Sequence, residues 1–375
     1  MTDNRLRLLH EAGQSVWLDY IDRAMLRDGS LQRLIRDDAL MGMTSNPTIF
    51  EKALAEGTLY DDQVHQHAGD RSPSELFELV ETDDVRAACD QFAEVYRATH
   101  GADGYVSIEV SPGVANDASA TVEEAQRLWR TVDRPNVMVK VPGTDEGAKA
   151  VRTLIAQGIN VNITLLFAVR AHESVIDAYL DGLEARLTAG GRIDHLASVA
   201  SFFVSRVDSE VDKRLEALAA ASPNDAARCL ALRGQAAVAN ARLAYRLFTR
   251  KFSGQRWSAL AERGARLQRP LWASTSTKNP AYRDVIYVEE LIGPHTVNTM
   301  PPATVDAFRD HGVVARTVDA HDAEADGVMS GLRSVGIDFD DVTAKLLRDG
   351  LASFQKSFES LIAGLERKSA ALINR

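Results

Sequence analysis

The sequence predicts an α/β fold, a closed (β/α)8 TIM barrel with helical insertions and C-terminal helices. Two observations predict it: short runs rich in β-branched and aromatic residues occur eight times, and helical patterns lie between most of them. Eight such strands favour a closed barrel over an open sheet. The length of 375 residues exceeds the roughly 250 of a simple barrel and leaves room for insertions. The expected strands cover residues 16–20, 42–47, 105–110, 136–141, 159–167, 196–203, 271–277 and 296–300.

Helix-start and helix-stop signals lie between the expected strands. Ser72–Glu75 and Thr121–Glu124 both have the form of a capping box, in which a hydroxyl and a carboxylate bind the first free N–H groups of a helix. Residues 171–191 carry apolar residues near a period of 3.6 and end at two glycines, which predicts a helix that stops there. Residues 143–149 resemble a phosphate-binding loop only loosely, because the spacing differs and two acids intervene. We expect a loop and a helix start at this place.

The length beyond a simple barrel falls in three segments with helical patterns. Residues 48–104 and 204–270 each predict several helices between strands, and residues 303–375 predict a helical cap after the last strand. None of the three is low in complexity, and no repeat of fixed period occurs. We therefore expect one domain over residues 1–375, with its strands within about 16–300; a separate C-terminal domain is the weaker alternative.

The composition disfavours several classes of protein. The chain carries 43 Lys and Arg against 53 Asp and Glu, a formal charge of −10, whereas a nucleic-acid binder needs a basic surface. No apolar run approaches the roughly 18 residues that span a bilayer, and no signal-peptide pattern is present. Cys89 and Cys229, the only cysteines, are far apart, so we expect no disulfide and no cysteine zinc site. We expect a cytoplasmic monomer or homodimer without nucleic-acid or membrane partners.

Motifs for cofactors and metals are missing from the sequence. No G-x-G-x-x-G follows the first expected strand, no G-x-S-x-G occurs, and the nine histidines form no H-E-x-x-H pair. We therefore expect no cofactor and no metal.

Alternation along the expected strands predicts a polar barrel interior. Successive residues of a barrel strand face the helices and the lumen in turn. On residues 136–141 three valines share the outer face, so Lys140 faces the lumen. On the second expected strand, we place Met41 and Met43 on the outer face. Burying polar groups costs on the order of several kcal/mol unless they are paired. The inward residues from five strands are Asp19, Thr44, Asn46, Ser107, Glu109, Met138, Lys140, Asn160, Asn162 and Thr164.

These residues also have plain structural interpretations. A lone lysine in a strand usually lies at an edge with its amine in solvent, and Asp19 could cap the helix that follows it. Residues 160–164 could form the wet face of an antiparallel sheet. The functional interpretation is favoured because polar residues recur at inward positions of five independent strands, where a structural barrel interior carries Val, Ile and Leu.

The inward residues indicate covalent chemistry on a carbonyl compound. A lysine flanked by carboxylates, without a cofactor motif, suggests a Schiff base, and Glu109 and Asp19 could move the protons. Barrels frequently bind phosphate in the loops after their last strands. Two cations lie just past the sixth and seventh expected strands here, and each of these strands also carries a serine. The candidate ligands of an anionic group are Ser201, Arg206, Ser274 and Lys278.

Six motifs together resemble the transaldolase family, in its longer form of about 370 residues. The resemblance covers about residues 15–300. The six motifs together are far more specific for the family than any one of them alone. The motifs are TSNPTIF (44–50), VSIEVSP (106–112), VMVKVPGTDEGAKAV (137–151), GINVNITLLF (158–167), SFFVSR (201–206) and STSTKNP (274–280).

The resemblance implies a class I transferase of the non-oxidative pentose phosphate pathway. Such an enzyme moves a dihydroxyacetone unit from sedoheptulose 7-phosphate to glyceraldehyde 3-phosphate, giving erythrose 4-phosphate and fructose 6-phosphate. Carried over by motif, Lys140 is the Schiff-base lysine, Glu109 an acid/base acting through a water, and Asp19 the base for C3–C4 cleavage. Thr164 would hold the water, and the implied substrate-binding residues are Thr44, Asn46, Asn162, Ser201, Arg206, Ser274, Ser276 and Lys278.

One position departs from the family pattern. Much of the family carries an arginine after the seventh strand where this chain has Lys278, which keeps the charge but loses the bidentate fork. The serine alignment there leaves both Ser274 and Ser276 as possible phosphate ligands.

Two other functions stay open at this point: a fructose-6-phosphate-type aldolase of the same fold, and a sugar-phosphate-binding barrel without activity.

Overall fold

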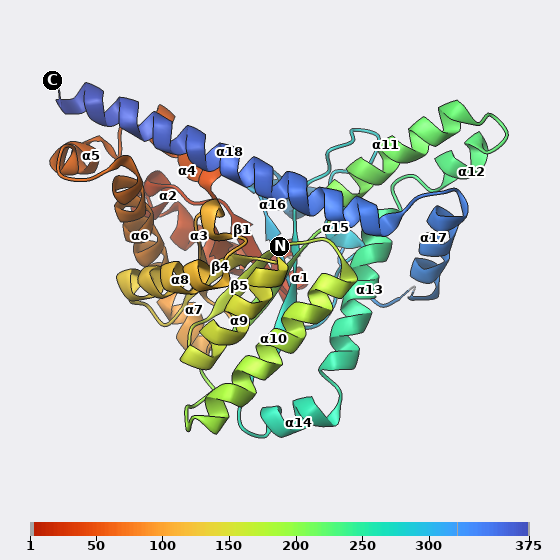
Figure 1. The fold of residues 1–375 in the computed structure, drawn as a ribbon, viewed down its shortest axis with the longest axis horizontal. Coiled ribbons are helices and arrows are strands. Elements are labelled where there is room, and N and C mark those ends of the chain that lie inside the picture. The colour runs from red at the N-terminus through yellow and green to blue at the C-terminus, as the bar shows by residue number, and fades with distance from the viewer. Residues whose placement is uncertain (1–3, 321, 374–375) are drawn as a thin grey trace.

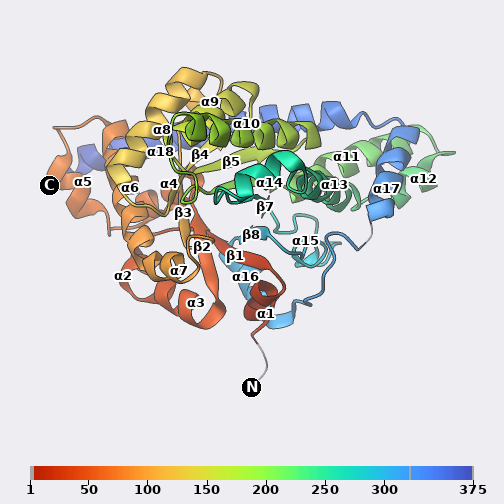
Figure 2. The same cartoon turned by 90° about the horizontal axis from the view of Figure 1, so that it is seen from below.

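A closed barrel of eight parallel strands forms the centre of the computed structural model, which describes residues 4–320 and 322–373. The strands follow one another around the barrel in chain order, and the last pairs with the first. This arrangement confirms the predicted (β/α)8 fold (Figures 1 and 2). The strands are β1 (Gln14–Asp19), β2 (Leu40–Thr44), β3 (Tyr105–Glu109), β4 (Val137–Pro142), β5 (Val161–Leu166), β6 (Ser198–Phe203), β7 (Gln268–Ala273) and β8 (Thr296–Met300).

Helices surround the barrel and fill the three segments expected to be helical. Four α-helices lie between β2 and β3, four between β6 and β7, and three after β8. The helices up to β5 are α1 (Arg5–Glu11), α2 (Arg23–Arg27), α3 (Ser30–Asp38), α4 (Pro47–Glu56), α5 (Asp61–His67), α6 (Pro73–Gln91), α7 (Ala93–Ala98), the 3₁₀ turn η1 (Pro112–Val114), α8 (Ala118–Val132) and α9 (Asp145–Gln157). Those that follow are α10 (Val169–Thr188), α11 (Ser205–Ala221), α12 (Ala226–Ala231), α13 (Ala236–Lys251), α14 (Gln255–Ala261), α15 (Ile286–Glu289), α16 (Pro302–His311), α17 (Asp322–Ser334) and α18 (Phe339–Ile373).

The barrel interior is divided into an apolar lower part and a polar upper part. The aromatic rings of Trp17 and Tyr105, with Met138, Val199 and Leu271, form a cluster separate from the helix-facing core. Gly42 makes room for this cluster, because a Cβ atom there would lie 2.5 Å from the Trp17 ring. The apolar plug closes the lumen below the C-terminal ends of the strands and leaves the polar side chains above it.

A β-bulge changes the expected alternation of β2. Val16 pairs with Leu40 and Trp17 pairs with Gly42, so Met41 is an extra residue in the ladder. Met41 packs beside the lumen cluster, whereas Met43 belongs to the outer core, and the prediction that the two share a face was wrong. Alternation resumes after the bulge, so Thr44 still faces the lumen.

Other predicted boundaries also need correction. The expected strand at 271–277 runs instead over Gln268–Ala273 and ends where Ser274 takes a left-handed φ of +55°. The expected strand at 42–47 ends at Thr44, because Asn46 caps α4. The capping box at Ser72 is confirmed, but Thr121–Glu124 is not a helix start: α8 begins three residues earlier and is capped by Asp117.

The 35-residue helix α18 lies along the C-terminal end of the barrel. It packs against α4, α5 and α6 on one side and α11 on the other, as Figures 1 and 2 show. Lys368 fixes its last turns, since Nζ donates to the carbonyls of Leu54 and Gly57 and lies 2.6 Å from Asp61 Oδ1. Within the described residues, no helix combines the length and the hydropathy needed to cross a membrane.

A buried carboxylate joins three of the helices behind β6 and β7. Asp208 of α11 accepts hydrogen bonds of 2.8 Å from the Ala237 N–H at the start of α13 and from the Tyr287 hydroxyl of α15. The side chain is 1% exposed, and burial raises its pKa from 3.8 to about 6 in spite of these two donors. The carboxyl group is therefore more easily protonated in the native state than in the unfolded chain.

We expect Asp208→Asn to change how stability depends on pH. Because the native pKa lies above the unfolded value, the contribution of Asp208 is fully present below about pH 4 and is lost as the pH rises through about 6. The neutral asparagine does not titrate, so its variant avoids this loss. The difference in the free energy of unfolding between the variant and the unchanged protein should therefore shift by about 2–3 kcal/mol in favour of the variant from pH 4 to pH 7. Urea unfolding at several pH values measures this difference. If the free energies of unfolding of the two proteins changed in parallel with pH, the raised pKa of Asp208 would be contradicted.

Candidate active site

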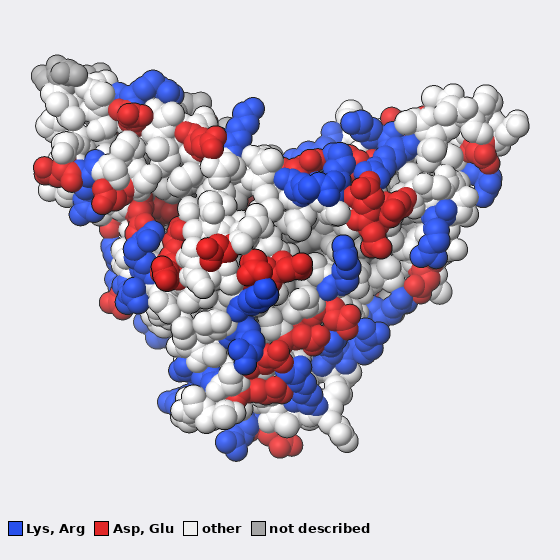
Figure 3. Space-filling model, in the orientation of Figure 1, with Lys and Arg blue, Asp and Glu red and all other residues white. Residues whose placement is uncertain are grey.

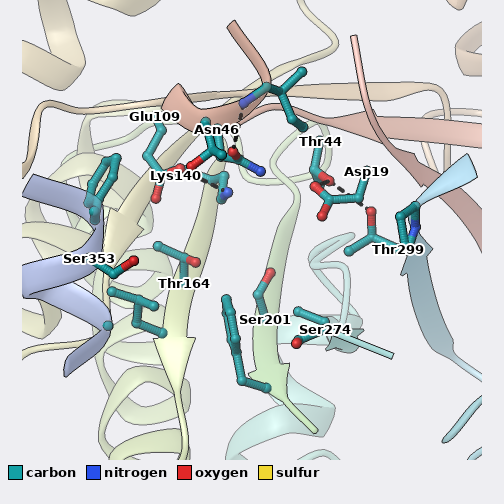
Figure 4. Close-up of a pocket in the computed structure, with 18 of the residues that line it drawn as sticks. Asp19, Thr44, Asn46, Glu109, Lys140, Thr164, Ser201, Ser274, Thr299 and Ser353 are labelled. Carbon is teal, nitrogen blue, oxygen red and sulfur yellow. Dashed lines mark hydrogen bonds and ion pairs between the residues drawn. The ribbon is translucent and has the colours of Figure 1, made fainter. Parts of the chain in front are cut away.

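A cavity of about 510 Å³ opens at the C-terminal ends of the barrel strands (Figure 4). Active sites of such barrels lie at this end. Eleven of the twelve site residues expected from the sequence line the cavity, and Asn162 lies buried below it. The eleven are Asp19, Thr44, Asn46, Glu109, Lys140, Thr164, Ser201, Arg206, Ser274, Ser276 and Lys278.

The amine of Lys140 and the carboxylate of Glu109 form a buried ion pair at the base of this cavity. The two residues are direct neighbours in the register of β3 and β4, so the two inward side chains meet. Lys140 Nζ lies 3.0 Å from Glu109 Oε2 and donates a second bond of 3.0 Å to the carbonyl of Ser45. The side chains are only 9% and 6% exposed. Burial raises the pKa of Glu109, and the neighbouring lysine opposes that shift.

A second carboxylate enters the cavity from the end of β1. Asp19 Oδ1 accepts a hydrogen bond of 2.8 Å from the Thr44 hydroxyl of β2, and Thr44 Oγ1 lies 2.7 Å from Thr299 Oγ1 of β8. Asp19 therefore stands across the lumen from the ion pair, as Figure 4 shows. The site contains two carboxylates in different surroundings: Glu109 is paired with an amine, and Asp19 accepts a hydrogen bond from the Thr44 hydroxyl.

Amide and hydroxyl groups connect the strands between these two carboxylates. Asn162 donates to Ser107 Oγ at 3.0 Å and accepts from the Ser201 hydroxyl at 2.6 Å, so its amide group is fixed below the cavity. Asn46 caps α4 through Oδ1, which accepts from the Ile49 N–H, and this leaves its NH2 group for other partners. Thr164 lines the wall next to α18. The remaining inward candidate, Asn160, lies before β5 and bonds backbone groups of neighbouring strands.

Two further cationic side chains of the cavity, Arg206 and Lys278, lie at its outer end, past β6 and β7. Arg206 is packed over the Phe203 ring, with the guanidinium carbon 5.2 Å from the ring centroid, and burial lowers its pKa. Among the described residues its guanidinium forms no hydrogen bond and no ion pair. Lys278 is exposed and donates to Ser276 Oγ at 2.7 Å. A half-buried guanidinium with free donors, in the same cavity as serine hydroxyls, has the chemistry that suits an anionic group.

Several cavity residues were not expected from the sequence. Alternation along β8, with Val297 in the lumen cluster, indicates Thr299 as inward-facing and could have found it. The residues from α18 carried no such signal, since their position depends on how the helix crosses the barrel. The additional lining residues are Tyr20, Pro47, Thr48, Ile49, Leu165, Phe203, Ala273, Thr299, Pro301, Pro302, Gly350, Ser353 and Phe354.

Comparison with known proteins assigns this barrel to a family. The family described as transaldolase/fructose-6-phosphate aldolase matches residues 16–365. The chain belongs to this family. A transaldolase of Acidothermus cellulolyticus is 49% identical over 98% of this chain and 97% of its own length. Transaldolases of Mycobacterium leprae and Thermobifida fusca are each 48% identical, over 95% and 98% of this chain and 94% and 98% of their own lengths.

These similarities confirm the resemblance seen in the motifs and support an enzyme of the transaldolase type. The geometry of the site suits the covalent chemistry of such an enzyme, because a buried amine has a carboxylate at hydrogen-bonding distance and a second carboxylate lies across the cavity. Among residues 4–320 and 322–373 no group of three His, Cys, Asp or Glu side chains is placed to hold a metal ion.

The part of α18 above the cavity has no room for a larger side chain at Gly350. A Cβ atom there would lie 3.0 Å from Leu165 Cδ2 and 3.8 Å from Arg206 Nη1. Leu165 lines the cavity, so a side chain added at Gly350 would push the Leu165 methyl groups into the cavity beside Arg206. Gly350 therefore allows the helix to pack closely over the end of the cavity that contains Arg206.

We expect Gly350→Val to raise the KM for fructose 6-phosphate by about five- to fiftyfold, because the branched side chain pushes on Leu165 and Arg206. Steady-state kinetics measures the effect. Gly364→Val is the matched control on the same helix, where the nearest neighbouring atom to a Cβ is Arg367 Nη2 at 3.9 Å. Equal KM values for the two variants would contradict a role of Gly350 at the site.

Proposed function

We propose that the protein is a transaldolase that transfers a dihydroxyacetone unit from sedoheptulose 7-phosphate to glyceraldehyde 3-phosphate. The products are erythrose 4-phosphate and fructose 6-phosphate, as in the non-oxidative pentose phosphate pathway. The observation that carries the proposal is the buried pair of Lys140 and Glu109 at the catalytic end of the barrel, with Asp19 across the cavity. The family assignment supports the same reaction and, more broadly, sugar-phosphate substrates.

The first step is the formation of a Schiff base on Lys140. A proton passes from the ammonium group to Glu109, 3.0 Å away, and the neutral Nζ attacks C2 of the ketose. The raised pKa of Glu109 favours its role as proton acceptor. The attack leaves a positive charge on Nζ and a negative charge on the C2 oxygen, and a proton moves from Nζ to that oxygen to give the neutral carbinolamine. Glu109 then returns its proton, through a water held by Thr164, to the hydroxyl of the carbinolamine. That hydroxyl leaves as water, and the iminium ion forms.

The second step is the cleavage of the C3–C4 bond. Asp19 takes the proton of the C4 hydroxyl, the C3–C4 electron pair moves toward the iminium nitrogen, and C4 leaves as the aldehyde. The enamine of dihydroxyacetone stays on Lys140 until the acceptor aldehyde arrives. Its C3 attacks that aldehyde, Asp19 returns the proton to the new hydroxyl, and hydrolysis of the iminium ion releases the product ketose.

The remaining polar residues hold the substrate during these steps. We assign the hydroxyl groups of the dihydroxyacetone unit to the amide of Asn46, and the phosphate to Arg206 with Ser201. Asn162, which the motifs also imply as a substrate ligand, lies below the cavity and instead fixes the Ser201 hydroxyl. The free guanidinium of Arg206 supports this assignment, as do the serine hydroxyls around it. Ser274, Ser276 and Lys278 line the same end of the cavity and complete the proposed phosphate site.

The single domain, the monomeric or homodimeric state and the cytoplasmic location stay predictions from the sequence.

Reduction with borohydride in the presence of fructose 6-phosphate should trap a covalent adduct on Lys140. The iminium ion is reduced to a stable secondary amine, and peptide mapping by mass spectrometry locates it. Lys140→Met should give neither adduct nor transfer, and Lys149→Met, an exposed lysine in the following helix, serves as the control that keeps both.

An adduct on another lysine, or none, would refute this mechanism. Free dihydroxyacetone should accumulate only slowly when no acceptor aldehyde is present, because the enamine is retained. Rapid multiple turnover to free dihydroxyacetone would instead indicate an aldolase of the same family.

Arg206→Ala should raise the KM for phosphorylated sugars by roughly 10- to 100-fold, because a charge-assisted contact to the phosphate is lost. The KM for unphosphorylated dihydroxyacetone should change little. Arg214→Ala is the control on the same helix, since that arginine pairs with Glu210 and Asp341 away from the cavity. Equal effects of Arg206→Ala on both kinds of substrate would refute the phosphate role.

A further inference from the structure

Three side chains from neighbouring strands form a hydrogen-bonded row that ends on Asp19. Thr299 of β8 lies next to Thr44 of β2, with 2.7 Å between the hydroxyl oxygens, and Thr44 donates to Asp19 Oδ1 at 2.8 Å (Figure 4). The two threonines are 4% and 2% exposed, so this row lies out of bulk water. All three residues line the cavity.

The direction of each hydrogen bond in the row follows from proton counting. A hydroxyl group has one proton, and an ionised carboxylate can only accept. The proton of Thr44 is therefore used on Asp19, and the bond between the two threonines must be donated by Thr299. Hydrogen bonds in such a chain polarise one another in a low-dielectric site, so the Thr299 donor strengthens the bond that Thr44 makes.

We propose that Thr299 is a positioning residue for the carboxylate of Asp19, acting through Thr44. The inference rests on the proposed function, in which Asp19 takes the proton of the C4 hydroxyl. The row holds Oδ1, and among the described residues Oδ2 has no hydrogen-bond partner and is the oxygen left for the substrate. Asp19 is the last residue of β1 and is only half-buried, so packing alone does not fix its side chain.

The row keeps its hydrogen bonds while Asp19 gains and loses its proton. When Oδ2 takes the proton of the C4 hydroxyl, Oδ1 becomes the carbonyl oxygen of a carboxylic acid and still accepts from Thr44. No hydroxyl has to rotate during the reaction. Thr44, whose single proton is already used, acts on Asp19 rather than as a donor to the substrate.

Thr299→Val removes the first donor and keeps the shape of the side chain. We expect the turnover number for transfer from fructose 6-phosphate to fall about three- to tenfold, with KM nearly unchanged, and Thr299→Ser to restore it to within about twofold. Thr44→Val should lower turnover further, by about 10- to 100-fold. The double variant should equal Thr44→Val alone, because Thr299 acts only through Thr44.

Trapping with borohydride and dihydroxyacetone separates this role from a general loss of the site. The Schiff base of dihydroxyacetone forms without C–C cleavage, so the trapping rate of Thr299→Val should stay within about twofold of the unchanged protein. Thr296→Val is the control, because it removes another buried hydroxyl of β8 that lies outside the cavity. This hydroxyl donates to the Gly293 carbonyl and accepts from the Gln14 amide, which keeps its second bond to the Leu291 carbonyl, so turnover should stay unchanged.

The outcomes distinguish this inference from the proposed function. If the unchanged protein gives neither adduct nor transfer, the proposed function fails. If it transfers but Thr299→Val turns over equally well, loses trapping in parallel with turnover, or adds its effect to that of Thr44→Val, the positioning role is wrong. A Thr299→Ser variant as slow as Thr299→Val would also overturn it.

Discussion

The buried ion pair between Lys140 and Glu109 is the constraint on which the rest of the site depends. Removing two charges from water costs on the order of several kcal/mol per ion. The attraction between the two charges offsets this cost only when their geometry is good and their other donors are satisfied. The barrel meets this condition through its register, which places the two residues opposite each other on β3 and β4, and through the Ser45 carbonyl. An amine that already has a carboxylate at 3.0 Å can release its proton without a rearrangement of the protein.

The ion pair can be kept at this depth because the barrel below it is closed and apolar. Trp17 and its neighbours fill the lower lumen, and Gly42 gives the ring its space, so the polar groups lie on a packed base. Above the site, α18 closes one side of the mouth with Gly350 and Phe354. The polar side chains therefore lie above an apolar plug, with the ion pair deepest and α18 along one side of the mouth. At the base of the cavity, where Lys140, Glu109 and Thr44 are shielded from bulk water, hydrogen bonds hold the side chains in place.

The sequence predicted the parts of this arrangement that follow from strand alternation. Lys140, Glu109 and Asp19 could be placed in the lumen because each lies one or two positions from apolar residues of known direction. The bulge at Met41 could not be predicted, since an extra residue leaves no mark in a run of apolar side chains. The helix start at Thr121 was wrong because Asp117, a few residues earlier, is an equally good cap. The contacts of α18 depend on tertiary packing, which no local pattern encodes.

The charge of the protein makes the attraction for an anionic substrate a local property of the site. The net charge is −10, and Figure 3 shows basic and acidic side chains interspersed over the face that it presents. Such a surface gives a sugar phosphate no long-range attraction, because the interspersed charges largely cancel within a Debye length of about 8–10 Å and the remaining net charge is negative. The binding energy must come from a cation that is close, partly desolvated and unpaired. Arg206 meets these three conditions, because its guanidinium packs over Phe203 and has no ion-pair partner among the described residues, so a bound phosphate would replace water rather than a carboxylate.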